Sequence, residues 1–213
     1  MEYDDYVKGA KLRDYENEKK IMLGDIKDHE MRVLKDDGIY RHLRFRSQGS
    51  NSYWFDLVTW PGCLVINGDC GTYSFSRLPG MFEFFRNDEL KIRPSYYAEK
   101  LLGPTTYKKY SRAALIHKVD DHIEEAFYGD DQVVKKSLQD DVADVIFYDL
   151  DDAGPELAYA KVYNYEYDDG TLSSWQFVDF WDGGTADEYD YHYLWSLYAI
   201  VWGIREYDRS KGE

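Results

Sequence analysis

The sequence has few of the residues that mark secreted and membrane proteins. It contains only two cysteines, Cys63 and Cys70, among 213 residues, too few for the disulfide framework of a small secreted domain. Its longest apolar stretch, residues 194–204, is too short to span a bilayer. The first residues lack the basic and apolar regions of a secretory signal peptide. We therefore predict a cytoplasmic protein with two reduced thiols and no membrane partner.

The sequence also lacks the local motifs of catalysis. It has no glycine-rich phosphate-binding loop, no nucleophile elbow and no H-E-x-x-H zinc motif. His117 and His122 are five residues apart, which places them on different faces of a helix, and no third ligand stands at zinc-like spacing. We predict a protein that is not an enzyme, with no catalytic residues, no metal site and no cofactor.

Positive charge is scarce in the second half of the chain. Residues 1–115 carry 19 Lys and Arg against 17 Asp and Glu, whereas residues 116–213 carry 7 against 24. The whole chain has a net charge of −15. Self-repulsion on this scale costs folding stability, so its retention suggests an electrostatic purpose. The same charge repels nucleic acid backbones and anionic lipids, which predicts no direct binding to either.

The apolar pattern of the first half predicts an antiparallel β-meander. Aromatic residues make up 17% of the chain, which is far from the composition of a disordered segment. Turn signals at 37–38, 61–62 and 67–68 separate runs that alternate apolar and polar residues. These runs predict five strands, at residues 31–34, 39–45, 53–60, 63–66 and 72–75. Residues 1–27 are expected to form a polar helix or arm before the meander, which spans 28–78.

Helical patterns dominate residues 79–213, so we predict a single α+β domain over 1–213 with a mainly helical, acidic second part. Expected helices cover 81–86, then 96–102 after a Ser95 cap, then a segment that opens at Ser111. Others begin at Asp130 or Asp131 and at Pro155. Residues 175–181 are expected to be extended. A helix over 191–207, apolar almost all round, is expected at the centre of the helical part.

Many of the acidic residues have ordinary structural explanations. Asp36-Asp37 and Asp168-Asp169 each precede a glycine and are typical of turns. Aspartates at 130 and 151 stand where helices begin, as caps do. Seven others lie inside predicted helices, where Asp costs about 0.5 kcal/mol relative to Ala. We predict that these seven form the binding surface for a partner: Asp120, Asp121, Glu124, Glu125, Asp140, Asp141 and Asp144. Tyrosines accompany them, and exposed Tyr beside Asp is typical of surfaces that bind Arg-rich partners.

Several motifs of the first half and of the C-terminal end resemble one family of proteins. They are Y-R-H-L-R-F at 40–45, F-D-L-V-T-W-P-G at 55–62, Y-S-F-S-R at 73–77, M-F-E-F-F-R at 81–86 and W-G-I at 202–204. Together they resemble a family of bacteriophage and prophage proteins of about 200 residues that carries no assigned activity. The resemblance covers 28–93 and 190–208 densely and the acidic middle loosely. It implies an accessory protein made by a phage in the bacterial host cytoplasm.

These observations favour a phage-encoded acidic binding protein that mimics DNA. Such a protein would inhibit a host defence complex, of the CRISPR or restriction type, by occupying its basic nucleic-acid site. One alternative is a metal-dependent enzyme acting on nucleic acid or nucleotide, in which Asp56, Asp69, Arg77 and Glu83 converge on the metal. Another is a virion or assembly component whose acidity serves solubility.

Overall fold

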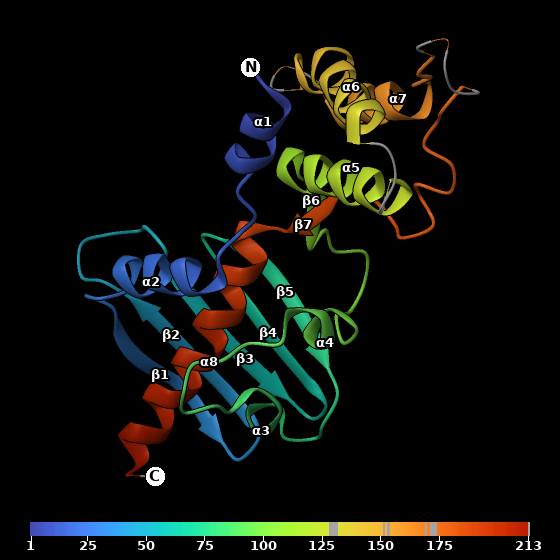
Figure 1. Ribbon diagram of the computed structural model, residues 1–213. Helices are drawn as coiled ribbons and strands as arrows, with labels where there is room; N and C mark the ends of the chain where they lie inside the picture. Colours follow the sequence, from blue (N-terminus) through green and yellow to red (C-terminus); the bar gives the residue numbers. More distant parts are fainter. Residues whose placement is uncertain (128–131, 151, 153, 169, 171–173, 213) are drawn as a thin grey trace. The chain divides into compact units, whose positions relative to one another are not determined.

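The chain forms two compact units in a computed structural model, which describes residues 1–127, 132–150, 152, 154–168, 170 and 174–212 (Figure 1). Unit 1 comprises residues 1–13 and 109–188, and unit 2 comprises residues 14–108 and 189–213. The sequence alone predicts a single domain over 1–213. The difference arises because each unit gathers segments from distant parts of the chain around its own hydrophobic core.

Unit 2 contains the predicted five-stranded antiparallel sheet. Its strands are β1 (Glu30–Asp37), β2 (Tyr40–Arg46), β3 (Phe55–Trp60), β4 (Cys63–Gly68) and β5 (Gly71–Ser76). They follow one another across the sheet in chain order, each antiparallel to the next. The turn predicted at Pro61-Gly62 joins β3 to β4, and Gly38 lies in the turn that joins β1 to β2. The turn predicted at Asn67-Gly68 is wrong: both residues still pair with β5 as part of β4, and Asp69 and Cys70 form the turn. The prediction of an α+β fold with an N-terminal meander is confirmed.

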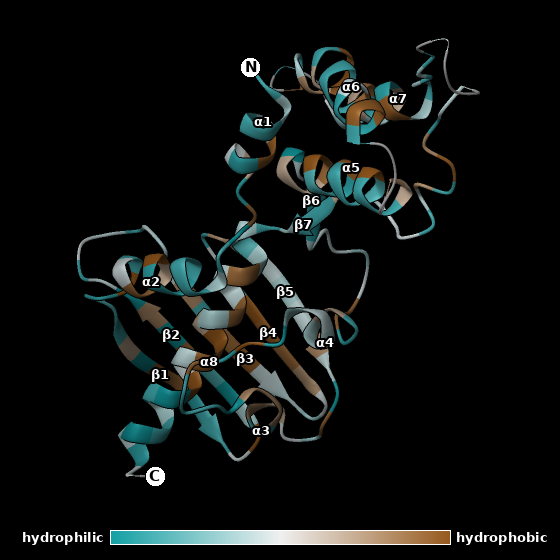
Figure 2. Cartoon of the chain, in the orientation of Figure 1, coloured by the Kyte–Doolittle hydropathy of each residue, from teal (hydrophilic) through white to brown (hydrophobic). Residues whose placement is uncertain are grey.

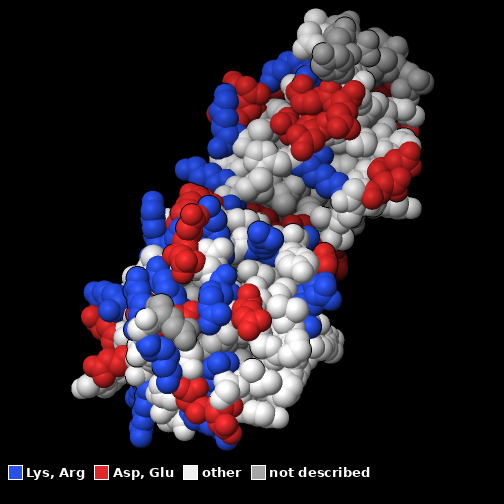
Figure 3. Space-filling model, turned by 90° about the horizontal axis from the view of Figure 1, so that it is seen from below, with Lys and Arg blue, Asp and Glu red and all other residues white. Residues whose placement is uncertain are grey.

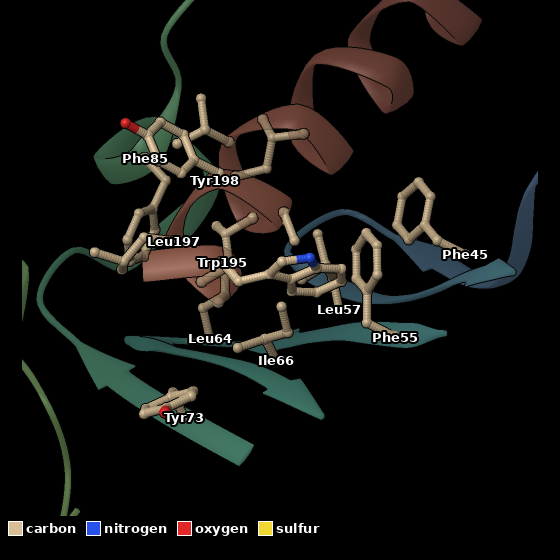
Figure 4. Close-up of a cluster of buried hydrophobic side chains, with 14 of the residues drawn as sticks. Phe45, Phe55, Leu57, Leu64, Ile66, Tyr73, Phe85, Trp195, Leu197 and Tyr198 are labelled. Carbon is tan, nitrogen blue, oxygen red and sulfur yellow. The ribbon is translucent and has the colours of Figure 1, made fainter. Parts of the chain in front are cut away.

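One face of this sheet carries the core of unit 2. Four helices contribute to the same core: α2 (Tyr15–Asp25), α3 (Met81–Phe85), α4 (Pro94–Ala98) and α8 (Tyr191–Lys211). Figure 4 shows Trp195 of α8 among side chains of the central strands, and Figure 2 shows hydrophobic residues concentrated on those strands. The strand residues of this core are 0–5% exposed: Leu43, Phe45, Phe55, Leu57, Leu64, Ile66, Tyr73 and Phe75.

Gly203 allows α8 to lie close against the sheet. A Cβ atom added there would stand 2.9 Å from Leu57 Cδ1 and 3.1 Å from Phe45 Cζ, closer than packed side chains tolerate. The helix is also held at both ends of its buried face. Trp195 Nε1 donates to Asp25 Oδ2 at 3.0 Å, and Tyr207 Oη donates to Asp36 Oδ1 at 2.9 Å. The helix therefore closes the core of the sheet, and it is not central to the acidic helical part as its all-round apolar pattern suggests.

Unit 1 is built from helices. They are α1 (Tyr3–Gly9), α5 (Arg112–Ala126), α6 (Gln132–Val142), the π-helical turn η1 (Ala143–Phe147) and α7 (Pro155–Tyr163). The predicted starts of two helices are confirmed: Ser111 caps α5 by accepting from Ala114 N–H, and Gly154-Pro155 opens α7. A second, two-stranded sheet pairs β6 (Lys108–Tyr110) with β7 (Asp187–Tyr189).

Other local predictions need correction. Residues 1–27 form two helices, one in each unit, in place of one polar helix or arm. The helix predicted after Ser95 begins instead at Pro94, because proline suits the first helical position. Residues 175–181 form no strand: Trp175 makes an isolated bridge to Tyr167, and Asp179 has a φ of 54° within a turn. The predicted caps Asp130 and Asp131 lie outside the described residues.

The two cysteines of unit 2 are free thiols. Cys63 is half-buried in β4, whereas Cys70 is buried in the turn between β4 and β5. Burial, reinforced by nearby negative charges, raises the pKa of Cys70 to about 12. Its thiol is therefore protonated at neutral pH and a poor nucleophile.

Replacement of Gly203 tests the close packing of α8. We expect Gly203→Ala to destabilise the protein by about 1–3 kcal/mol, because the added methyl overpacks the contact with Leu57 and Phe45. Urea denaturation measures the effect. The control is Gly24→Ala in α2, where an added Cβ meets nothing within 4 Å. That variant should gain up to about 1 kcal/mol from helix propensity, and an equal effect of both substitutions would contradict the packing argument.

Candidate functional site

The excess of negative charge belongs almost entirely to unit 1. By sequence, unit 1 carries 23 Asp and Glu against 9 Lys and Arg, a net charge of −14. Unit 2 carries 18 against 17, a net of −1. Figure 3 shows patches of acidic side chains on unit 1, in the upper part of the view, and many more basic side chains on unit 2. The charge split seen along the sequence is therefore a split between two structural units.

Two of the predicted acidic residues on α5 lie beside α1. Tyr3 Oη donates to Asp120 Oδ1 at 3.1 Å, and Glu124 Oε2 is 2.6 Å from Lys135 Nζ on α6. Burial raises the pKa of Asp120; the Tyr3 hydrogen bond opposes the shift, and the neighbouring charges of Glu124 and Asp121 add to it. Burial and the Asp120 charge likewise raise the pKa of Tyr3. Asp120 is thus crowded by like charges in a partly dehydrated place.

The acids at the end of α6 face the first residues of the chain. Lys136 Nζ lies 2.8 Å from Asp140 Oδ1, and the pKa of Lys136 is raised by this contact and by the charges of Asp4 and Glu2. Asp144 follows on η1 and is exposed. A hollow of about 330 Å³ is lined by Met1, Glu2, Lys136, Asp140, Ala143 and Asp144. Acids of α1, α5 and the α6–η1 segment therefore gather around α1.

We call this group the acidic surface and define it by Glu2, Asp4, Asp120, Glu124, Asp140 and Asp144. Sequence reasoning missed Glu2 and Asp4. Acids in the first turn of a helix are expected from the helix dipole alone, so nothing in their local pattern indicates a shared surface. The only signal in the sequence is that Glu2 and Asp4 stand next to Tyr3 and close to Tyr6, two aromatic residues that are buried in the structure.

The seven predicted residues do not all share this surface. Asp121 and Glu125 are exposed on α5, and among the described residues they have no hydrogen-bond or ion-pair partner. They lie one position round the helix from Asp120 and Glu124. Asp141 is half-buried and accepts a hydrogen bond from Tyr165 Oη at 2.7 Å, so it stabilises the fold of unit 1. Four of the seven residues belong to the acidic surface, two extend it and one is structural.

A second hollow in unit 1 has aromatic walls. It has a volume of about 470 Å³ and is lined in part by Glu156, Tyr159, Tyr163 and Trp181. The rings of Tyr159 and Trp181 are nearly perpendicular with centroids 5.0 Å apart, and Tyr163 is 78% exposed. Aromatic faces beside a carboxylate attract cations. This hollow suits the head of an Arg or Lys side chain.

The residues of the alternative metal site do not converge. Asp56 lies on β3, Asp69 receives a hydrogen bond from Tyr53 N–H at 2.8 Å in the β4–β5 turn, and Glu83 is exposed on α3. Arg77 is exposed after β5. The described part of the chain contains no group of three or more His, Cys, Asp and Glu side chains placed to hold a metal ion. These four residues are therefore not assembled into a metal centre.

Asp56 has a different environment that the sequence did not indicate. Its carboxylate is 8% exposed and accepts from Arg44 Nε and Nη2, both at 2.8 Å, while His42 Nε2 lies 2.9 Å from Oδ2. Burial raises the pKa of Asp56, but the hydrogen bonds and charges of Arg44 and His42 outweigh it and leave the pKa below its ordinary value. Asp56 is thus an ionised anchor for two basic side chains of β2.

Comparisons with protein-family models, with curated proteins and with solved structures give no match for this chain. The resemblance to a phage family therefore stays a prediction. No helix in the described part of the chain combines the length and the apolar character needed to cross a bilayer.

The crowding of charge at Asp120 predicts a stabilising substitution. The pKa of Asp120 is higher in the folded protein than in the unfolded chain, where it is about 3.9. Protonated Asp120 therefore stabilises the fold at low pH, and this contribution is lost as the pH rises through the folded pKa. Asp120→Asn retains an acceptor for Tyr3 and removes the charge. We expect it to stabilise the protein by roughly 0.5 kcal/mol at pH 7, the size of one i,i+4 like-charge pair.

Thermal denaturation between pH 4 and pH 7.5 measures this effect. The gain from Asp120→Asn should shrink as pH falls, because wild-type Asp120 then takes up a proton and is no longer repelled by the neighbouring carboxylates. Asp182→Asn is the control, because Asp182 is exposed and is not among the charges that raise the pKa of Asp120; it should change stability little at any pH. A stabilisation by Asp120→Asn that is independent of pH would contradict the assignment.

Proposed function

We propose that the protein is a non-enzymatic binding protein whose unit 1 occupies a basic nucleic-acid-binding site on a partner protein. The observation that carries this proposal is the partition of charge, −14 on unit 1 against −1 on unit 2. Acidity that served only solubility would have no reason to avoid unit 2. Confinement to one unit is what a surface that meets a basic partner requires.

The acidic surface supports this proposal by its arrangement. It draws carboxylates from three separate chain segments: α1, α5 and the α6–η1 segment. These segments meet around α1, where burial and the neighbouring like charges raise the pKa of Asp120. Three lysines of the described residues pair with its members: Lys8 with Asp4, Lys135 with Glu124 and Lys136 with Asp140. The hollow beside Asp140 and Asp144 and the aromatic hollow of α7 offer two places for cationic side chains. Exposed tyrosines and carboxylates together favour an arginine-rich contact.

The finer part of the proposal concerns the partner's identity. The resemblance to phage proteins supports a host defence complex, of the CRISPR or restriction type, in the bacterial cytoplasm. In that setting unit 1 would act as a DNA mimic, an inhibitor that occupies the channel of the defence complex. Membrane association is not part of the proposal, because the described helices are unsuited to crossing a bilayer.

Affinity capture from bacterial lysate tests the proposal. We expect a nucleic-acid-binding protein to be retained at 50 mM salt, to elute steeply between about 100 and 300 mM, and to be displaced by duplex DNA. Displacement by DNA is the decisive result, because it shows that the two ligands share one site. Retention that is insensitive to both salt and DNA would contradict the proposal.

Charge reversal locates the contact. Asp140→Lys/Asp144→Lys should lower capture at least about tenfold, whereas Asp141 is left intact because it holds Tyr165. The matched control, Glu166→Lys/Asp182→Lys, changes the charge of unit 1 equally at exposed positions outside the acidic surface. In cells with an active defence system, wild type should raise phage plating efficiency and the first variant should not. Equal behaviour of the two variants would reject the acidic surface.

A further inference from the structure

The sheet of unit 2 has a second face that none of its described helices covers. All four helices of the unit contribute to the core on the first face. On the second face, cross-strand partners form one polar row that runs across all five strands. From β1 to β5 its members are Arg32, Arg44, Asp56, Asn67 and Thr72. We call this the open face.

The arginine at the centre of the row is held in a fixed orientation. Arg44 makes two hydrogen bonds to the buried carboxylate of Asp56. Those bonds use two of the five N–H donors of the guanidinium, so three remain for another acceptor. Because Asp56 is ionised and anchored by His42 as well, Arg44 loses little side-chain entropy when it binds an anion.

Two further arginines stand beside it. Arg32 lies directly opposite Arg44 on β1, and Arg46 lies two residues further along β2 on the same face. Like charges opposite each other destabilise a sheet. Arg32 has no hydrogen bond or ion pair within the described residues, and Arg46 makes only long bonds of 3.4–3.5 Å to a neighbouring loop. Three arginines thus lie close together with two carboxylates, the buried Asp56 and the exposed Glu30, which is the cross-strand partner of Arg46.

These side chains line two adjoining hollows. The larger, about 530 Å³, is lined by Arg32, Arg44 and Arg46 together with residues 47–49, Met31 and Glu30, whose carboxylate accepts from Gln48. The smaller, about 230 Å³, is lined by Arg44, Arg46, Asn51 and Trp54. The same two arginines therefore border both hollows. One hollow offers cations, and the other adds an indole ring and an amide.

We propose that the open face binds single-stranded nucleic acid, with a phosphate held by Arg32, Arg44 and Arg46 and the adjacent base packed on Trp54. Arginine forks match phosphate oxygens, and aromatic rings stack on bases of any identity. Trp54 and Asn51 border the arginines directly: Arg44 Cζ lies 5.7 Å from the centroid of the Trp54 ring, and Asn51 Oδ1 accepts from Arg46 at 3.4 Å. An indole ring and an amide so close to the phosphate site suit the base of the same nucleotide. This proposal is independent of the function assigned to unit 1.

The net charge of the chain does not oppose this inference. The repulsion of nucleic acid expected from −15 arises in unit 1, whereas unit 2 has a net charge of −1. Within unit 2 the acidic and basic side chains nearly balance, so the arginines of the open face set the local charge there.

Fluorescence anisotropy of labelled 12-nucleotide oligothymidylate and oligouridylate, with the full chain at 100 mM salt, tests the proposal. Arg32→Gln/Arg46→Gln should weaken binding at least about tenfold and flatten the salt dependence by about 0.7 per lost phosphate contact. Trp54→Leu should weaken binding about tenfold and leave the salt slope unchanged, because stacking carries no charge. One probe is single-stranded DNA and the other single-stranded RNA, so binding of either one supports the proposal.

The matched control is Arg77→Gln/Arg93→Gln, which removes equal charge at exposed positions that line neither hollow. It should bind like wild type, and circular dichroism should show every variant folded. Failure of both probes to bind overturns the proposal. So does equal weakening by the control pair, or tighter binding of a duplex of the same length. An unaltered affinity of Trp54→Leu rejects the base contact and with it the assignment to nucleic acid.

Discussion

The packing of α8 on the five-stranded sheet is the contact on which the rest of the molecule depends. It is a close contact, since Gly203 brings the helix backbone within reach of Leu57 and Phe45. Polar side chains then fix the helix along its length, and Arg41 Nε donates to Tyr207 Oη across 166 residues of sequence. Because the sheet and its closing helix come from opposite ends of the chain, unit 1 is for the most part an insertion between them.

This arrangement places the acidic surface and the basic open face in different structural units. Unit 2 has a large core and almost balanced charge, so its basic open face can hold three arginines with one buried carboxylate as counterion. In unit 1 the carboxylates of the acidic surface repel one another, and contacts with Tyr3, Lys135 and Lys136 reduce this repulsion in part. If one unit carried both the acidic and the basic side chains, the two groups would neutralise each other. Division into units keeps an acidic surface and a basic face distinct within one chain.

Local signals in the sequence were enough to predict the meander and several helix starts. Pro61-Gly62 and Ser111 act through their own backbone and immediate neighbours, so no tertiary information is needed to predict this turn and this helix start. The position of α8 was not predictable, because a helix that is apolar all round does not reveal which surface it packs on. The role of Asp141 depended on Tyr165, which is distant in sequence. The Arg44–Asp56 pair could be found only with the strand register, which places 44 opposite 56.

The insertion of unit 1 also sets an order for biosynthesis. Translation delivers α1, α2, the five strands, α3 and α4 first, then the whole of 109–188, and only afterwards α8, the helix that Gly203 brings close to the apolar face of the sheet. Until residues 191–211 leave the ribosome, a nascent chain exposes Phe45, Phe55 and Leu57 without their native cover. While residues 109–188 are being synthesised, the nascent chain therefore exposes the apolar surface that a chaperone would bind.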